Sequence, residues 1–138
     1  MRTKINKGFT LLELLIALAI LAIIAAILIP NFFATTDRAR LRSDIQSARV
    51  IQNAIDLYNV ERTPAISGDM GAILDRLQAQ GFLRERYTSP QTEGAIWARH
   101  ATLGVVVDIT GSSESIHRAY DGLPAAEQQF IIGGRRTS

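Results

Sequence analysis

The sequence predicts an α+β protein in which a long N-terminal helix packs on a small C-terminal head with a short antiparallel sheet. Three observations lead to this prediction. An apolar run of 21 residues extends from Phe9 to Ile29, interrupted only by a threonine and a glutamate. Apolar residues at helical spacing then continue as far as Tyr58. Two segments rich in β-branched and aromatic residues follow, at residues 95–98 and 103–109.

The overall composition averages two different parts of the chain. Hydrophobic residues make up 47% of the 138 residues, but 19 of the 22 residues from Phe9 to Pro30 are apolar. The rest has the composition of a soluble globular domain without a second long apolar run, which excludes a polytopic membrane protein. The absence of cysteine excludes a disulfide scaffold, an iron–sulfur protein and a cysteine-ligated zinc site. By composition and pattern we expect four segments, at residues 1–8, 9–30, 31–62 and 63–138.

The positive charge is concentrated at the N-terminus. The formal net charge is +2, and both lysines lie within the first eight residues together with Arg2. Without residues 1–8 the chain would hold 12 arginines against 13 acidic residues, a net charge of −1. A negative net charge argues against nucleic acid as a general partner.

The apolar run has the length of a membrane-spanning helix. At about 1.5 Å per residue it spans about 30 Å, the thickness of one hydrocarbon core. A secretory signal has a shorter apolar region followed by a small-residue cleavage site, so removal of the whole run is not expected. Glu13 is the one charged residue in it. Glu13 either reaches the lipid headgroups or has a cationic partner, and cleavage after Gly8 would create such a partner in the α-amine of Phe9.

Residues 7–14, Lys-Gly-Phe-Thr-Leu-Leu-Glu-Leu, together with the apolar run and Pro30, closely resemble the class III signal of type IV pilins and pseudopilins. The resemblance implies that a membrane peptidase cuts after Gly8 and then methylates Phe9. It also implies that Glu13 is required for assembly and that Pro30 matches a proline of the family. Many pilins carry a glycine within this segment. Here the segment contains no glycine, and Pro30 is its one helix-breaking residue. We expect Pro30 to bend the helix or loosen its preceding turn.

The same resemblance implies the partners and the location of the chain. The expected partners are a prepilin peptidase, an inner-membrane assembly platform, other pilins or pseudopilins, further copies of the chain itself, and membrane lipid before assembly. The expected location is the bacterial inner membrane, crossed once with the head outside the cytoplasm, and afterwards a periplasmic or extracellular filament. The basic residues on the two sides of the run are nearly balanced, so this orientation follows from the resemblance and not from charge.

The helix is predicted to continue beyond the apolar run, from Thr10 to Glu61. One apolar stripe at helical spacing is expected to pack on the head, and it comprises Leu41, Ile45, Ala48, Ile51, Ile55 and Tyr58. Arg40 and Asp44 are expected to form an i,i+4 ion pair on another face. The arginines there, including Arg38, Arg42 and Arg49, could contact phospholipid headgroups, neighbouring subunits or solvent.

The head is predicted to contain short elements separated by loops. Asp69 is expected to cap a short helix that ends at Gly81. Residues 84–94 form a loop, residues 95–98 and 103–109 form two strands, and residues 111–113 form a turn. The pattern at residues 115–120 is ambiguous, and residues 123–132 are expected to form a last short helix.

The head carries no constellation typical of catalysis. His100 and His117 lack metal-ligand spacing and are expected at the surface. Asp108, Glu114 and Asp121 do not match a dense acidic calcium loop. Trp97 is expected in the core, and neither a nucleophile elbow nor a phosphate loop is present. The sequence therefore predicts no enzyme activity, no cofactor and no metal.

The function predicted by the resemblance is that of a structural subunit of a type IV pilus-like filament. An alternative is a pseudopilin of a type II secretion or DNA-uptake (competence) machine. The head has no cysteine, whereas many pilins close a C-terminal loop with a disulfide, and this fits pseudopilins and cysteine-free pilins better. A second alternative is a single-pass anchored periplasmic binding module that does not polymerise.

Overall fold

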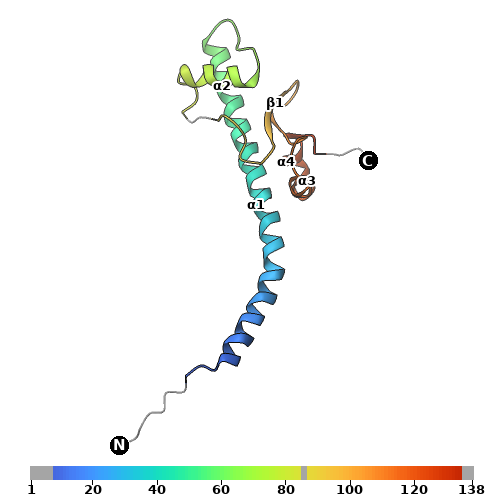
Figure 1. Cartoon of the computed structure of the whole chain (residues 1–138). Coiled ribbons are helices and arrows are strands. Elements are labelled where there is room, and N and C mark those ends of the chain that lie inside the picture. Colours follow the sequence, from blue (N-terminus) through green and yellow to red (C-terminus); the bar gives the residue numbers. More distant parts are fainter. Residues whose placement is uncertain (1–7, 85–86, 135–138) are drawn as a thin grey trace, which may run out of the picture. The chain divides into compact units, whose positions relative to one another are not determined.

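The computed structural model describes residues 8–84 and 87–134, without the side chains of Pro30 and Asn31. Four helices and three strands follow one another along the described chain (Figure 1). In order they are α1 (Leu11–Glu61), α2 (Met70–Ala79), β1 (Ile96–His100), β2 (Gly104–Asp108), α3 (Glu114–Asp121), α4 (Ala125–Gln128) and β3 (Ile131–Ile132). The predicted class, a long N-terminal helix followed by a small α+β head, is confirmed.

The long helix α1 has 51 residues and agrees with its predicted bounds to within one residue. The chain falls into two compact units, one ending at Phe33 and one beginning at Ala34, and α1 contributes to both. In the first unit every described side chain is exposed. Among the described residues, α1 is the one helix long and apolar enough to cross a membrane. Residues 1–7 lie outside the described residues.

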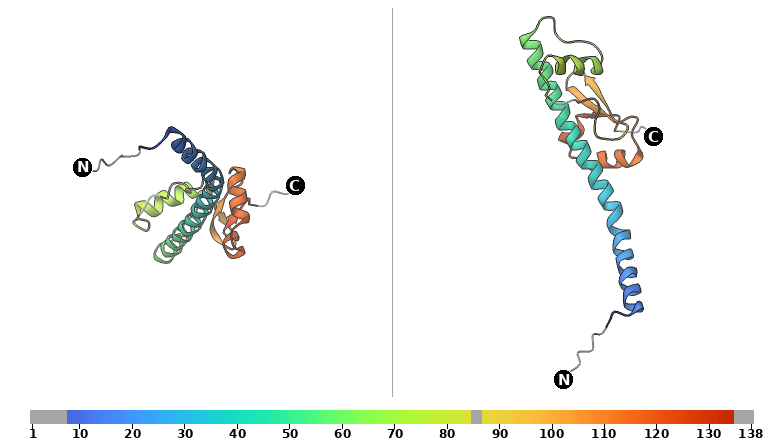
Figure 2. Two further views of the ribbon diagram at one scale, coloured as in Figure 1. Left: turned by 90° about the horizontal axis from the view of Figure 1, so that it is seen from below. Right: turned by 60° about the vertical axis from the view of Figure 1, so that its left-hand side comes forward.

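In the second unit, α1 packs on the head through the predicted stripe. Five of the six stripe residues are buried, and Tyr58 is partly buried against the same core. Side chains of α2, the sheet and α3 complete this core, among them Ile73, Val107 and Ile116. The two further views show α2 near the C-terminal end of α1, with α3 and α4 nearer its middle (Figure 2). The helical spacing of the stripe therefore indicated correctly which face of α1 packs on the head.

The sheet has three strands in the order β1-β2-β3. β1 and β2 pair antiparallel, as predicted, and in the structure Trp97 lies opposite Val107. β3 pairs parallel to β2, with Val107 opposite Ile131, and this third strand was not predicted. The predicted helix over residues 123–132 is correct only for α4. Ile131 and Ile132 leave the helix because the backbone around them pairs with β2, where the Val107 and Ile109 amides donate to the Phe130 and Ile132 carbonyls at 3.0 Å.

The shorter helices show how local residue types determine their ends. Asp69 caps α2 as predicted, and its carboxylate accepts hydrogen bonds from the Gly71 and Ala72 amides at 3.1 and 3.4 Å. Gly81 follows the end of α2 with a φ of +79°, a conformation that glycine adopts readily. The ambiguous segment 115–120 is helical and belongs to α3.

Two predictions for polar residues are wrong. Asp44 does not pair with Arg40. Its side chain is 1% exposed, and its carboxylate accepts from the Gln91 and Thr92 amides at 2.7 and 2.9 Å. Arg40 lies 3.9 Å from Asp37 instead. The Gln91 and Thr92 amides that bond to Asp44 belong to a loop 47 and 48 residues further along the chain, so helical spacing alone could not indicate them.

His117 is also not at the surface. It is 7% exposed and lies on the buried face of α3, whereas His100 is exposed as expected. Within the described part of the structure, neither ring nitrogen of His117 has a hydrogen-bond partner. The prediction followed from the polarity of the residue type, but the position of residue 117 on an amphipathic helix determines its burial.

Candidate assembly site

The predicted processing junction lies on an exposed, non-helical segment. Gly8, Phe9 and Thr10 precede α1, and Phe9 is 92% exposed. A Cβ added at Gly8 would meet no atom within 4 Å, and its backbone does not have a positive φ. The folding of the described chain therefore does not require glycine at position 8. A requirement for glycine would have to come from a protein that binds this segment.

Thr10 and Glu13 form a capping box at the start of α1. The Thr10 hydroxyl accepts a hydrogen bond from the Glu13 amide at 3.2 Å. In return, one carboxylate oxygen of Glu13, Oε2, accepts from the Thr10 amide at 2.9 Å and from the Thr10 hydroxyl at 3.1 Å. This reciprocal pattern satisfies backbone N–H groups that a helix N-terminus otherwise leaves without partners.

The capping box gives Glu13 a role that the sequence interpretation missed. The signal was present, since threonine followed three residues later by glutamate before an apolar run is typical of a helix start. A carboxylate can accept about four hydrogen bonds in total. The two bonds from Thr10 use one oxygen, so capping and pairing with an external cation are compatible in geometry.

The helix that starts at this site exposes a continuous apolar surface. Among the described residues from Phe9 to Phe33, the large apolar side chains are between 47% and 92% exposed. An apolar surface of this extent marks contact with a membrane or with other proteins. Pro30 lies within the helical segment, but its side chain is outside the described structure. The expected effect of Pro30 on the helix stays a prediction.

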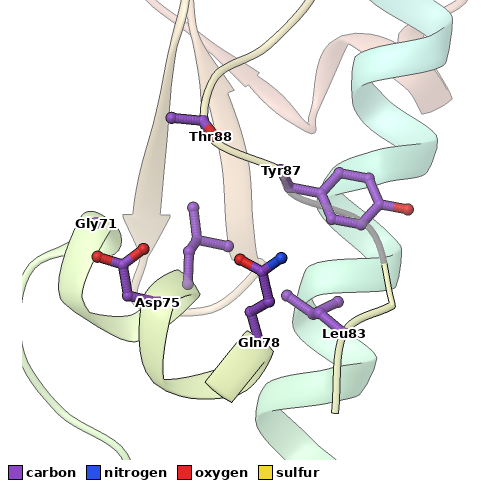
Figure 3. Close-up of a pocket in the computed structure, with 7 residues that line it drawn as sticks. Gly71, Asp75, Gln78, Leu83, Tyr87 and Thr88 are labelled. Atoms are coloured by element: carbon purple, nitrogen blue, oxygen red, sulfur yellow. The ribbon is translucent and has the colours of Figure 1, made fainter. Parts of the chain in front are cut away.

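A shallow pocket lies beside α2 in the head. Its volume is about 160 Å³, and Gly71, Asp75, Gln78, Leu83, Tyr87 and Thr88 are among its lining residues (Figure 3). Figure 3 shows Asp75 and Gln78 on α2 and Tyr87 and Thr88 on the chain that returns past it. The structure does not bring any predicted site residue into this pocket.

Two further polar side chains of the head, those of Trp97 and Asp108, form hydrogen bonds within the head. Trp97 is buried as predicted, and its indole nitrogen donates to the Tyr87 carbonyl at 3.1 Å. Asp108 accepts from the amide and the hydroxyl of Thr110 at 2.9 and 2.6 Å, and so closes its own turn. In residues 8–84 and 87–134 no group of three or more histidine and acidic side chains is positioned to hold a metal.

The N-terminal part of the chain matches a known family, and the chain is similar to several known proteins. Residues 3–29 match the family described as the prokaryotic N-terminal methylation motif. The chain is 27% identical over 78 residues to the type II secretion system core protein G of Klebsiella michiganensis, covering 55% of each chain. It is 67% identical over 70 residues to the type IV wide pilus major component PilA4 of Thermus thermophilus, covering 49% of this chain and 51% of the relative.

A third similar protein is the prepilin peptidase-dependent protein A of Clostridium perfringens, which is 40% identical over 60 residues. That match covers 42% of this chain and 43% of the relative. The chain thus spans about half the length of the curated relatives it matches. No solved structure matches the chain.

Proposed function

Because the chain belongs to the type IV pilin and pseudopilin family, we propose that it is a structural subunit of a type IV pilus-like filament. The family is non-enzymatic. In this proposal residues 1–8 form a leader peptide, which is removed by cleavage after Gly8, and Phe9 becomes the methylated N-terminus. Residues 9–30 form the membrane and assembly helix, residues 31–62 continue this helix, and residues 63–138 form the head.

The observation that carries the proposal is the position of Glu13. It is the one charged residue in an exposed apolar helix, and it lies at the helix start, four residues from the proposed new amine of Phe9. Helices that leave the bilayer must bury their apolar surface against one another, and apolar packing alone tolerates sliding along the helix axis. A carboxylate that requires a neighbour's amine is satisfied at one register only. Glu13 and Phe9 would therefore set the height at which subunits join.

Before assembly, the apolar helix anchors the chain in a membrane. Its length, apolar composition and methylation motif are consistent with such an anchor. The proposed membrane is the bacterial inner membrane, with the head outside the cytoplasm, followed by a periplasmic or extracellular filament. The proposed partners are membrane lipid, a prepilin peptidase, an inner-membrane assembly platform, and then other copies of this chain or related pilins.

A second candidate function is that of a pseudopilin in a type II secretion or DNA-uptake machine. The similarity to type II secretion system core protein G supports the secretion version. The similarity to a major pilus component, at 67% identity over 70 residues, supports a pilus. Both functions use the same processing and the same assembly helix, and they differ in the machine that draws the subunits out of the membrane.

Filament isolation tests the proposal. The chain should appear in filaments sheared from cells that contain a prepilin peptidase and a pilus assembly platform, and also when it is expressed with such a machine in a heterologous host. Gly8→Val should abolish this incorporation but leave the full-length precursor in the membrane fraction, because an added side chain disturbs nothing in the described structure. Filaments that assemble only with a secretion platform would favour the pseudopilin. A processed chain that never enters filaments would contradict both and support the anchored module.

A further inference from the structure

Three arginines on one face of α1 contact the last part of the head. Arg38, Arg42 and Arg49 follow one another at spacings of four and seven residues, which places their side chains on the same side of a helix. The sequence left headgroups, neighbouring subunits or solvent as alternatives for these arginines. In the structure each one contacts its own head, at a different point of residues 122–132, which we call the C-terminal strap.

The three contacts differ in chemistry. The Arg42 Nε donates to Glu127 Oε2 at 2.9 Å, in an ion pair between residues 85 positions apart. The guanidinium carbon of Arg49 lies 4.6 Å from the centre of the Phe130 ring, in a cation–π contact.

The guanidinium of Arg38 lies against Gly122, where an added Cβ would overlap it. Gly122 caps the C-terminus of α3, an end that favours positive charge. The arginines therefore hold the strap at its beginning, in its middle and near its end.

The other contacts of the strap are a hydrogen bond from the Gln128 side chain to the Tyr120 carbonyl of α3, two buried side chains and the pairing with β2. Its helix, α4, contains no buried residue, and its strand, β3, has only two residues. Leu123 and Ile131 are buried in the core, and the Val107 and Ile109 amides of the β2 edge donate to the Phe130 and Ile132 carbonyls. If the strap moved away, both amides on this edge would lose their acceptors.

We propose that Arg38, Arg42 and Arg49 form a latch that holds the C-terminal strap on α1 and controls access to the edge of β2. The latch responds to ionic strength, since the side chains of Arg42 and Glu127 are 52% and 31% exposed and salt screens exposed pairs. An open strap offers an unpaired strand edge, which another extended chain can join. The latch therefore keeps the strap paired with β2 and prevents another chain from pairing with this strand.

Amide hydrogen exchange of the isotope-labelled full-length chain in detergent micelles tests the latch. Arg42→Gln should accelerate exchange at the Val107 and Ile109 amides by up to about fivefold, the upper end of the range expected for an exposed ion pair. Wild-type protein at about 1 M salt should show the same change. The Val105 amide is an internal control, because it donates to Gln52 Oε1 on α1 at 3.0 Å and not to the strap.

Matched variants separate the latch from general loosening of the head. Arg40→Gln removes an arginine of the same helix that contacts Asp37 and should leave exchange at both amides unchanged. Gly122→Ala should accelerate hydrogen exchange at both amides, because it displaces Arg38 without removing a charge. The double variant Arg42→Glu/Glu127→Arg, which swaps the two charges, should restore the wild-type rate. Unchanged exchange at Val107 and Ile109 in Arg42→Gln would overturn the proposal. Equal acceleration at Val105, or in Arg40→Gln, would overturn it as well.

Discussion

Replacing Glu13 by alanine should leave the chain in the membrane but reduce its incorporation into filaments by about tenfold or more. The reduction is expected because the neighbour's amine would then be buried among apolar helices without a partner, which weakens association strongly. Insertion should continue, since the apolar run around position 13 is unchanged and the substitution removes its one charge. Membrane fractionation measures insertion, and immunoblots of sheared filaments measure incorporation.

Glu13→Gln separates the two roles of the side chain. Glutamine at the third position of a helix completes a capping box as glutamate does, but it carries no charge. If charge pairing is the assembly role, Glu13→Gln should be as defective as Glu13→Ala. Thr10→Ala, which weakens the cap and keeps the charge, should assemble much better than either. Normal filaments from Glu13→Gln would show that Glu13 acts only as a helix cap.

Asp44→Ala should destabilise the head by about 3 kcal/mol, because it leaves the buried Thr92 amide and the partly buried Gln91 amide without acceptors. Those amides, of Gln91 and Thr92, belong to the loop that leads into β1, and Asp44 fixes this loop on α1. The single tryptophan, Trp97, is buried just beyond the same loop, and its fluorescence reports unfolding in denaturant.

The control for this prediction is Asp75→Ala, at an exposed position of α2. It should change the free energy of unfolding by less than about 0.5 kcal/mol. Asp44→Asn should be intermediate, since an amide oxygen can accept one of the two bonds while its amino group faces the other donor. If Asp44→Ala unfolded at the same denaturant concentration as wild type, this result would contradict the role of Asp44 in holding the loop on α1.

The long helix could be predicted from the sequence because its evidence is local. The apolar run and the stripe from Leu41 to Tyr58 repeat at helical spacing, and the structure buries that face. Local signals also identified Asp69 as a cap and the β1–β2 pair. The capping box of Thr10 and Glu13 has an equally local signal, a threonine followed three residues later by a glutamate.

The features that escaped prediction depend on contacts between distant parts of the chain. The hydrogen-bond partners of Asp44 lie on a loop nearly fifty residues further along the chain. Ile131 is a strand residue because its backbone pairs with the edge of β2. The ion-pair partner of Arg42 is Glu127, which lies on a helix too short to show a periodic pattern in the sequence. In each case the residue type permitted several partners, and the tertiary fold selected one.

The mass and the N-terminal sequence of the mature chain test the proposed cleavage after Gly8 and methylation of Phe9 directly. Protein isolated from cells with an active prepilin peptidase should begin at Phe9, carry a methyl group on its α-amine and lack all three basic residues of the leader. The same chain from cells without the peptidase should keep Met1. A chain that begins at Met1 while the peptidase is active, or one cut at a position other than the Gly8–Phe9 bond, would contradict the account.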